Sequence, residues 1–336
     1  GACRQGREGA GGVTGYGLVL VLRADPLGAS FYRPSGNWSN RVQFLINVIE
    51  GAGAPLGPGV GARILRPSGS MSNPPSPSIL GRVMIASRLA ILHDIDPEWT
   101  ERVLLPHFDW ANPIEARGAW QGFLWSPWVR PSLWAKLKPF ALQTPDHLAE
   151  LGEHHEQFVP FMVSISVDGD GALSLDETRA LLKKLAPSDL ALAAYWLESR
   201  VSEAGTPGWK GIADWVVAVW PKELAVQSPA VSQHLAKLPA LVPDRFPEIV
   251  DLVSELIGAI EHGDMVLGDL EKEELASLHP EKALILVDRI TPDAPTPWFG
   301  NLKGTLQRIA AAGPELVGNP RYVPLLQIST KAGIWV

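Results

Sequence analysis

Hydrophobic positions recur every three to four residues along the chain from about residue 78 onward. The stretch from Ile79 to Leu92 is typical, because its apolar side chains fall on one face of a helix. No alternating run of strand length occurs in the sequence after residue 80. The pattern therefore predicts helices over 79–93, 97–105, 113–124, 131–142, 145–165, 175–185, 188–203, 207–220, 229–238, 244–261, 270–278, 281–290, 297–312 and 320–330.

Helix-capping residues stand directly before proline at many of the predicted helix starts. The pairs are Asp96-Pro97, Asn112-Pro113, Ser126-Pro127, Thr144-Pro145, Thr206-Pro207, Ser228-Pro229, Thr296-Pro297 and Asn319-Pro320. The capping side chain accepts a free backbone N–H of the first turn, and proline follows where it has no N–H to lose. Many short helices joined by short loops predict an all-α fold, either an irregular α-solenoid or a set of stacked helical hairpins.

The first 80 residues differ from the rest in composition. They contain 15 of the 32 glycines and 8 of the 30 prolines, which raises the entropy cost of ordering and interrupts helices and sheets. Two short apolar runs occur in this part of the chain. Residues 17–22 predict a strand, and residues 42–49 predict either a strand or a helical segment. We therefore expect residues 1–77 to be a poorly ordered Gly/Pro-rich segment or the remnant of an upstream domain. Residues 78–336 would then form a helical array domain.

Charge is also unevenly distributed along the chain. The net charge is −7 at pH 7, but residues 1–80 carry seven arginines, no lysine and three acids, which leaves −11 for residues 81–336. This acidic balance argues against a nucleic-acid partner and favours a protein partner. The apolar runs are far shorter than the ~18 residues of a membrane span, so no membrane association is expected. The single cysteine, Cys3, excludes a disulfide framework and a cysteine-based zinc site.

The N-terminal residues bear on whether the chain is part of a longer protein and on its location. The chain begins with Gly rather than Met, which indicates a piece of a longer or processed protein. No signal-peptide pattern is found, and we expect a cytoplasmic location.

Tryptophan is abundant, with 13 residues, and it is concentrated in one region. The aromatic cluster there consists of Trp110, Trp120, Phe123, Trp125, Trp128 and Trp134. Its helical spacing favours a bulky core between two helical hairpins, since tryptophan buries a large area. The alternative is an exposed aromatic groove that binds a partner helix.

The same region carries a family resemblance. The strings Asp96-Pro97-Glu98-Trp99, Leu104-Leu105-Pro106, Phe108-Asp109-Trp110, Ala116-Arg117 and 119–125 (AWQGFLW) carry it. They resemble the C-terminal helical domain, of unknown function, of large bacterial sirtuin-like proteins linked to anti-phage defence. The resemblance covers about residues 80–335 and implies that an N-terminal sirtuin-like domain degrades NAD while the helical part senses or regulates. Because that domain has no counterpart in this chain, no catalytic residue is carried over.

One loop matches much of a calcium-binding pattern. Against the twelve-residue EF-hand loop that starts at Ser166, the candidate ligands are Asp168, Asp170, Ser174 and Glu177. Ser166 departs from the pattern, because the first position calls for an aspartate. The same letters also describe a turn followed by a capping box, in which Ser174 and Glu177 open the next helix.

Three histidines form a second set of residues that could bind a metal ion. His147, His154 and His155 lie with three glutamates on the predicted helix 145–165, and His147 and His154 share a face. Zinc could use such a face, but the HExxH pattern is missing, and a solvated helix face explains the same residues.

The sequence predicts no catalytic residue and no cofactor. We therefore expect a non-catalytic helical interaction or regulatory module, acting on a protein partner or a neighbouring effector domain. The alternatives are a metal-dependent enzyme with an unrecognised site and a calcium-responsive helical module.

Overall fold

A computed structural model describes residues 77–332 except 170, 224–226 and 295–296, with side chains from residue 81 to 330. The expectations for residues 1–76, including the two apolar runs, lie outside the described residues. All described helices belong to one compact unit.

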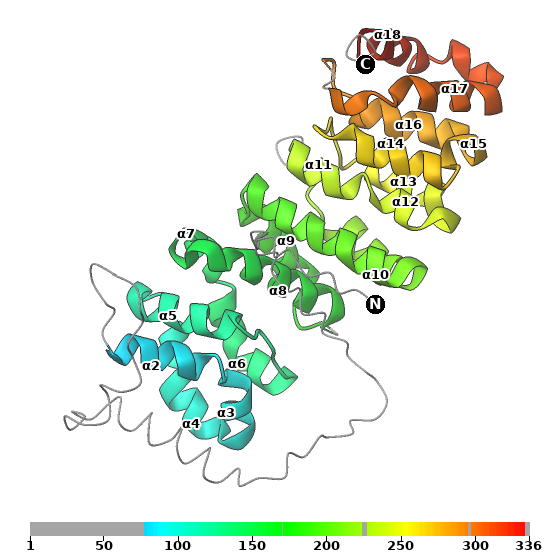
Figure 1. Ribbon diagram of the computed structural model, residues 1–336. Coiled ribbons are helices and arrows are strands. Elements are labelled where there is room, and N and C mark those ends of the chain that lie inside the picture. The colour runs from blue at the N-terminus through cyan, green and yellow to red at the C-terminus, as the bar shows by residue number, and fades with distance from the viewer. Residues whose placement is uncertain (1–76, 170, 224–226, 295–296, 333–336) are drawn as a thin grey trace, which may run out of the picture. The chain divides into compact units, whose positions relative to one another are not determined.

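The predicted all-α fold is confirmed. The described part of the chain forms helices and contains no strand (Figure 1). The α-helices are α2 (Pro77–Ala86), α3 (Leu89–Ile95), α4 (Pro97–Trp99), α5 (Pro113–Leu124), α6 (Pro131–Ala141), α7 (Leu148–Leu151), α8 (His155–Asp168), α9 (Leu175–Lys184), α10 (Pro187–Val219), α11 (Pro229–Leu235), α12 (Leu238–Leu241), α13 (Phe246–Val253), α14 (Gly263–Lys272), α15 (Leu275–Leu278), α16 (Pro280–Ile290), α17 (Leu302–Ala312) and α18 (Tyr322–Ala332).

Short helices of other types join them. They are the π-helix η1 (Thr100–Leu104) and the 3₁₀-helices η2 (Leu105–Phe108), η3 (Thr144–His147), η4 (Gly152–His154), η6 (Pro243–Arg245), η7 (Pro297–Phe299) and η8 (Pro314–Gly318).

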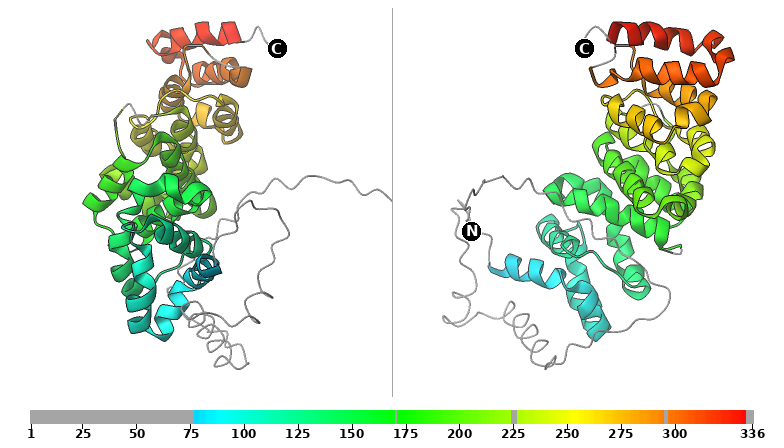
Figure 2. Two further views of the ribbon diagram at one scale, coloured as in Figure 1. Left: turned by 90° about the vertical axis from the view of Figure 1, so that its left-hand side faces the viewer. Right: turned by 45° about the vertical axis from the view of Figure 1, so that its right-hand side comes forward.

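Helices that are near in sequence pack against one another along the chain (Figures 1 and 2). Pairs in contact include α2 with α5, α8 with α10, α10 with α11, α15 with α17, α13 with α16, α16 with α17 and α17 with α18. This succession is the stacked, irregular helical array that the sequence predicts.

The apolar period explains why these segments become helices. In α13, Phe246, Ile249, Val250 and Val253 follow the spacing i, i+3, i+4, i+7, and all four are fully buried. Burial of such a stripe supplies most of the stability of a short helix, because isolated helices of this length are marginal in water.

The capping prediction is confirmed at two positions. The side chain of Asp96 accepts from the N–H of Trp99 at 2.9 Å, and Ser228 accepts from the N–H of Val231 at 3.3 Å. Asn112 precedes α5 without a side-chain cap, and no helix begins at Pro127. Of the other pairs, Thr144 already lies inside η3, and Thr296 lies outside the described residues.

The predicted helix 145–165 is not one continuous helix, because the α-helix is interrupted at Gly152. This glycine has φ 58° and ψ −137°, a conformation that residues with a Cβ rarely adopt. Gly205 has nearly the same angles (φ 57°, ψ −135°) and separates the two halves of α10, as the separate helices 188–203 and 207–220 predict.

The predicted helix 244–261 is correct only as far as Val253. The N–H groups of Ser254, Leu256 and Ile257 still make turn hydrogen bonds to Val250 and Val253, and the N–H bonds to distant parts of the chain begin at Gly258. The N–H of Gly258 donates to Ser232 Oγ, and the N–H of Ile260 donates to the carbonyl of Ile290, both at 2.9 Å. The next helix, α14, was not predicted before residue 270.

Candidate functional site

The aromatic cluster divides into a buried and an exposed part. Trp110, Trp120, Phe123 and Trp134 are at most 4% exposed and form part of the core. The core interpretation is wrong for Trp125 and Trp128, whose exposed fractions are 73% and 37%. Both lie in the loop between α5 and α6, beyond the helical stripe.

The indole N–H groups of the buried tryptophans have local partners. Trp110 donates to Thr144 Oγ1 at 2.9 Å, Trp120 to the carbonyl of Phe108 at 3.3 Å, and Trp134 to the carbonyl of Ala172 at 2.9 Å. These bonds let large indoles enter the core without leaving a polar atom unpaired.

The calcium candidates lie in the connection from α8 to α9. Ser166, the first position of the loop pattern, lies within α8, where its hydroxyl donates to the carbonyl of Val163 and accepts from Trp215 Nε1. Asp168 is paired with Arg200 at 3.1 Å, and Asp170 lies outside the described residues.

Ser174 and Glu177 form a complete capping box at the start of α9. The N–H of Glu177 donates to Ser174 Oγ at 3.2 Å, and the N–H of Ser174 donates to Glu177 Oε2 at 2.8 Å. Lys138 Nζ also lies 2.8 Å from Glu177 Oε2. Burial alone would raise the pKa of Glu177, but the hydrogen bonds from Lys138 and Ser174 hold it below the usual value. The carboxylate thus has protein partners.

Replacing Ser174 with alanine is expected to lower the free energy of unfolding by about 1 kcal/mol, because one N–H of the first turn loses its acceptor. Urea titration with and without calcium measures this loss, which should be equal in both. Ser164→Ala is the matched control, because Ser164 is a helix-interior serine that caps nothing. A calcium-dependent stabilisation that is lost in Ser174→Ala would instead favour the calcium interpretation.

The three histidines do not share one helix face, since Gly152 separates His147 from the other two. His147 stacks on Trp110 with ring centroids 4.4 Å apart and contacts Glu150 at 3.2 Å. His154 contacts Gln157, and His155 contacts the carbonyl of Gly152 and Asp189. Within the described ranges, no group of three or more His, Cys, Asp or Glu residues is placed to hold a metal ion.

A different polar group gathers around a hollow between α3 and α6. This hollow has a volume of about 480 Å³ and is called here the α3–α6 hollow. It is lined by His93, Asp94, Pro97, Glu101, Ser132, Ala135 and Lys136. Glu101 lies in the π-helix η1, a rare helix type that is frequent at functional sites. Its neighbour Thr100 is fully buried, and its hydroxyl has no hydrogen-bond partner in the described part of the chain.

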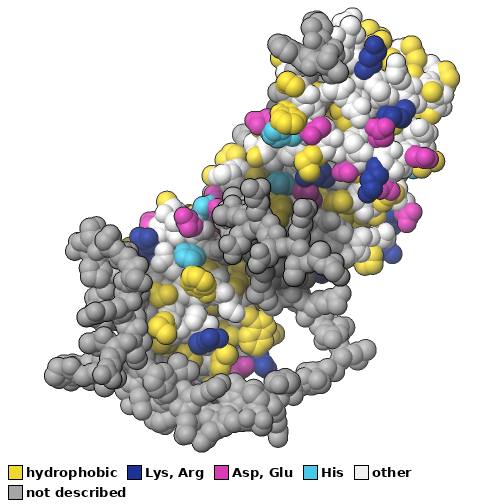
Figure 3. Space-filling view, in the orientation of Figure 1, with side chains coloured by type: hydrophobic (Ala, Val, Ile, Leu, Met, Phe, Trp, Pro, Cys, Tyr) yellow, Lys and Arg dark blue, Asp and Glu magenta, His cyan; other side chains and the backbone are white. Residues whose placement is uncertain are grey.

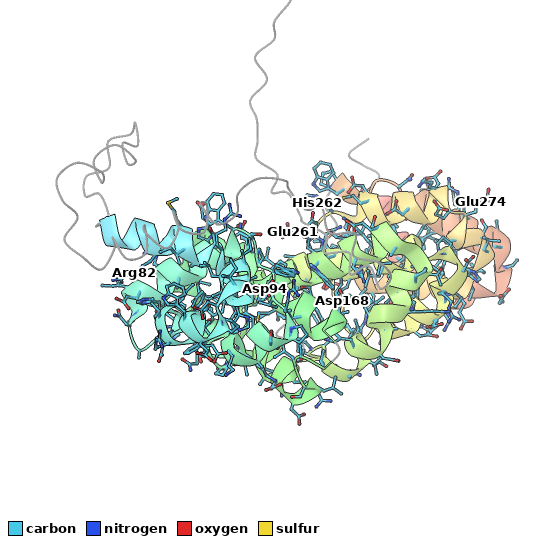
Figure 4. All side chains as sticks on the ribbon, turned by 90° about the horizontal axis from the view of Figure 1, so that it is seen from below. Arg82, Asp94, Asp168, Glu261, His262 and Glu274 are labelled. Atoms are coloured by element: carbon cyan, nitrogen blue, oxygen red, sulfur yellow. The ribbon has the colours of Figure 1, made fainter. Side chains whose placement is uncertain are left out.

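The charged side chains at this hollow form two ion pairs. Glu101 Oε2 lies 2.7 Å from Lys136 Nζ, and Asp94 Oδ2 lies 3.1 Å from Arg130 Nη2 (Asp94 is labelled in Figure 4). The hydrogen bond from Lys136, with a smaller contribution from His93, lowers the pKa of Glu101, so this carboxylate is ionised at neutral pH.

Exposed apolar side chains lie beside the hollow. Ile91 and Ile95 are 41% and 50% exposed and lie one turn apart on α3. The guanidinium of Arg130 lies 5.2 Å from the ring centroid of Trp128, a cation–π distance. We call Ile91, Asp94, Ile95, Trp128 and Arg130 together the α3 surface.

A second hollow, of about 520 Å³, lies near the C-terminal helices. It is lined by His279, Pro280, Glu281, Lys282, Glu315 and Leu316. His279 is half-buried there and stacks on Phe246, and Lys282 is paired with Asp251 at 2.5 Å. Its histidine therefore already packs against the protein's own side chains.

The sequence did not indicate the α3–α6 hollow. Its charged residues come from α3, η1 and α6, and no motif links positions so far apart. On the face seen in Figure 3, hydrophobic side chains lie among acidic and basic ones over the described surface.

No family model, curated protein or solved structure matches the chain. Across the residues that the structure describes, each helix is too short or too polar to span a lipid bilayer.

Proposed function

We propose that this chain is a non-catalytic helical module that binds a protein partner or a neighbouring effector domain. The observation that carries the proposal is the α3 surface. Trp128 and Arg130 are exposed in the loop, two isoleucines are exposed on α3, and the ion pair between Arg130 and Asp94 joins the loop to α3. Tryptophan and arginine are the residue types most enriched among interface residues that dominate binding.

The charge of the helical part supports a protein partner. Residues 81–336 carry a net charge of −11, which repels nucleic acid and attracts proteins with basic surfaces. The resemblance described above supplies an effector to test, a sirtuin-like domain that degrades NAD. Regulation of that domain requires contacts that differ between its active and inactive states.

The test measures binding of the full chain to an isolated sirtuin-like domain of the resembled defence proteins. We expect binding, a change in NAD consumption by that domain, and no NAD consumption by the chain alone. Ile95→Ser should weaken binding, because it replaces an exposed apolar side chain of the α3 surface with a hydroxyl.

Leu278→Ser is the matched control for this variant. Ile95 and Leu278 are each the last residue of a short helix, and they are 50% and 63% exposed. Equal loss in both variants would contradict a role of the α3 surface. Failure of the chain to bind the domain or change its activity would contradict the proposed effector. NAD consumption by the chain alone would show a catalytic site.

A further inference from the structure

His93 lines the α3–α6 hollow as a polar side chain that is almost completely buried. Only 6% of its side chain is exposed. Its Nε2 lies 3.8 Å from Glu101 Oε1, which is longer than a hydrogen bond. Buried polar groups almost always have a hydrogen-bond partner. Because Nε2 is too far from Glu101 for a hydrogen bond, it can form one with a ligand in the hollow.

Glu101, which faces His93 across the 3.8 Å separation, forms an ion pair with Lys136 that a ligand can displace. Lys136 Nζ contacts Oε2 at 2.7 Å, but the lysine side chain is 52% exposed and the glutamate side chain 34% exposed. An ion pair of this exposure contributes at most about 1 kcal/mol. A ligand with a better-matched cation can therefore take its place at little cost.

We infer that the α3–α6 hollow binds the guanidinium group of an arginine side chain from a basic segment of the protein partner. This inference rests on the interaction function proposed above and specifies the chemistry of the partner.

The geometry of the gap fits a guanidinium. A nitrogen that carries two hydrogens can lie about 2.9 Å from His93 Nε2 and from Glu101 Oε1, which are 3.8 Å apart. It donates to both atoms when the imidazole is neutral and carries its hydrogen on Nδ1. A second guanidinium nitrogen can then donate to Glu101 Oε2, in place of Lys136. Such two-point contact with a carboxylate is a property of arginine, since the lysine ammonium acts as a point charge.

The rest of the hollow suits the arginine stem. Pro97 and Ala135 present apolar atoms beside the acidic groups, and the methylene stem of arginine packs on surfaces of this kind. The net charge of −11 on residues 81–336 attracts a basic segment toward the domain.

The test is calorimetric titration of the full chain with a short arginine-only peptide and a lysine-only peptide of the same length. We expect the arginine peptide to bind more tightly. Glu101→Gln should weaken binding of the arginine peptide about tenfold or more, because the charged acceptor is lost. Ala135→Leu should weaken it as well without changing any charge, because it fills the hollow.

Glu273→Gln is the matched control for the charge change. Glu273 is 36% exposed and lies 3.1 Å from a lysine, Lys272, so it resembles Glu101 in both respects. The circular dichroism spectrum of each variant verifies that it is folded. Equal affinity for the two peptides, or equal loss in Glu101→Gln and Glu273→Gln, would overturn the inference, because binding would then reflect only general charge. Absence of arginine-peptide binding would overturn it too.

The peptide titration also separates this inference from the proposed function. Arginine-peptide binding that depends on Glu101, without binding of the sirtuin-like domain, would contradict only the proposed effector. Binding of that domain that is unaffected by Glu101→Gln would contradict only the arginine site.

Discussion

Replacing Trp120 with alanine is expected to lower the free energy of unfolding by about 3–5 kcal/mol, the cost of removing a fully buried aromatic side chain. The Trp120 ring is 0% exposed and makes edge-to-face contacts with Phe108 in η2, Phe123 in α5 and Phe158 in α8, at centroid distances of 5.0–5.9 Å. The alanine variant leaves a cavity where these elements meet. Urea unfolding measures the change.

Trp125→Ala is the matched control for this prediction, since it makes the same substitution at an indole that is 73% exposed. We expect a change within about 0.5 kcal/mol, as for most surface substitutions. Similar losses in both variants would show that the division of the aromatic cluster into core and surface is wrong.

Replacing Glu198 with glutamine is expected to cost about 3 kcal/mol at neutral pH, the lower end of the range for breaking a buried ion pair. Glu198 in α10 receives a hydrogen bond from His234 in α11 at 2.6 Å and one from Lys237, before α12, at 3.1 Å. The three side chains are only 12–26% exposed. The variant therefore leaves the ammonium of Lys237 largely buried without its closest carboxylate.

The pH dependence of this effect has a definite sign. Burial alone would raise the pKa of Glu198, but the hydrogen bonds from His234 and Lys237 outweigh it and hold the pKa below the usual glutamate value. A carboxyl group with a lowered pKa in the folded state contributes its stability above the unfolded value. The difference between the natural chain and Glu198→Gln should therefore be largest well above the usual glutamate pKa and should disappear as the pH falls through the lowered pKa.

Comparing the two proteins separates the pH effect of Glu198 from the pH effects of neighbouring titratable groups. Burial raises the pKa of nearby Asp269, which has the opposite pH dependence, but Asp269 is present in both proteins and its effect largely cancels in the difference. Combining Glu198→Gln with Lys237→Met should recover part of the lost stability, because the unpaired charge is removed. A double variant no more stable than Glu198→Gln would contradict this explanation.

The sequence determines much of the helical content and some of its local contacts. The apolar period fixes the fold class, and local hydrogen bonds such as those of Asp96, Ser228 and the Ser174–Glu177 capping box depend only on neighbours within three residues. Because both partners of each such contact lie within one helical turn of each other, their residue types and spacing are sufficient to predict it.

The sequence does not determine where the predicted helix 244–261 ends. Val253, Leu256, Ile257 and Ile260 have the same i, i+3, i+4, i+7 spacing as the buried stripe of α13, and all four are buried. Yet α13 ends at Val253, and the N–H of Ile260 donates to the carbonyl of the distant residue Ile290 instead of to a helical partner. The spacing indicates which side chains are buried and carries no information about a backbone partner thirty residues away.

Tertiary structure also decided which tryptophans are exposed and where a ligand can bind. Trp120 and Trp125 lie five residues apart, but α8 covers only the first. His93, Glu101 and Lys136 meet at one hollow only because α3, η1 and α6 pack together. Sequence spacing fixes side-chain positions within one helix, whereas a site shared by three helices depends on packing between them, which no local pattern encodes.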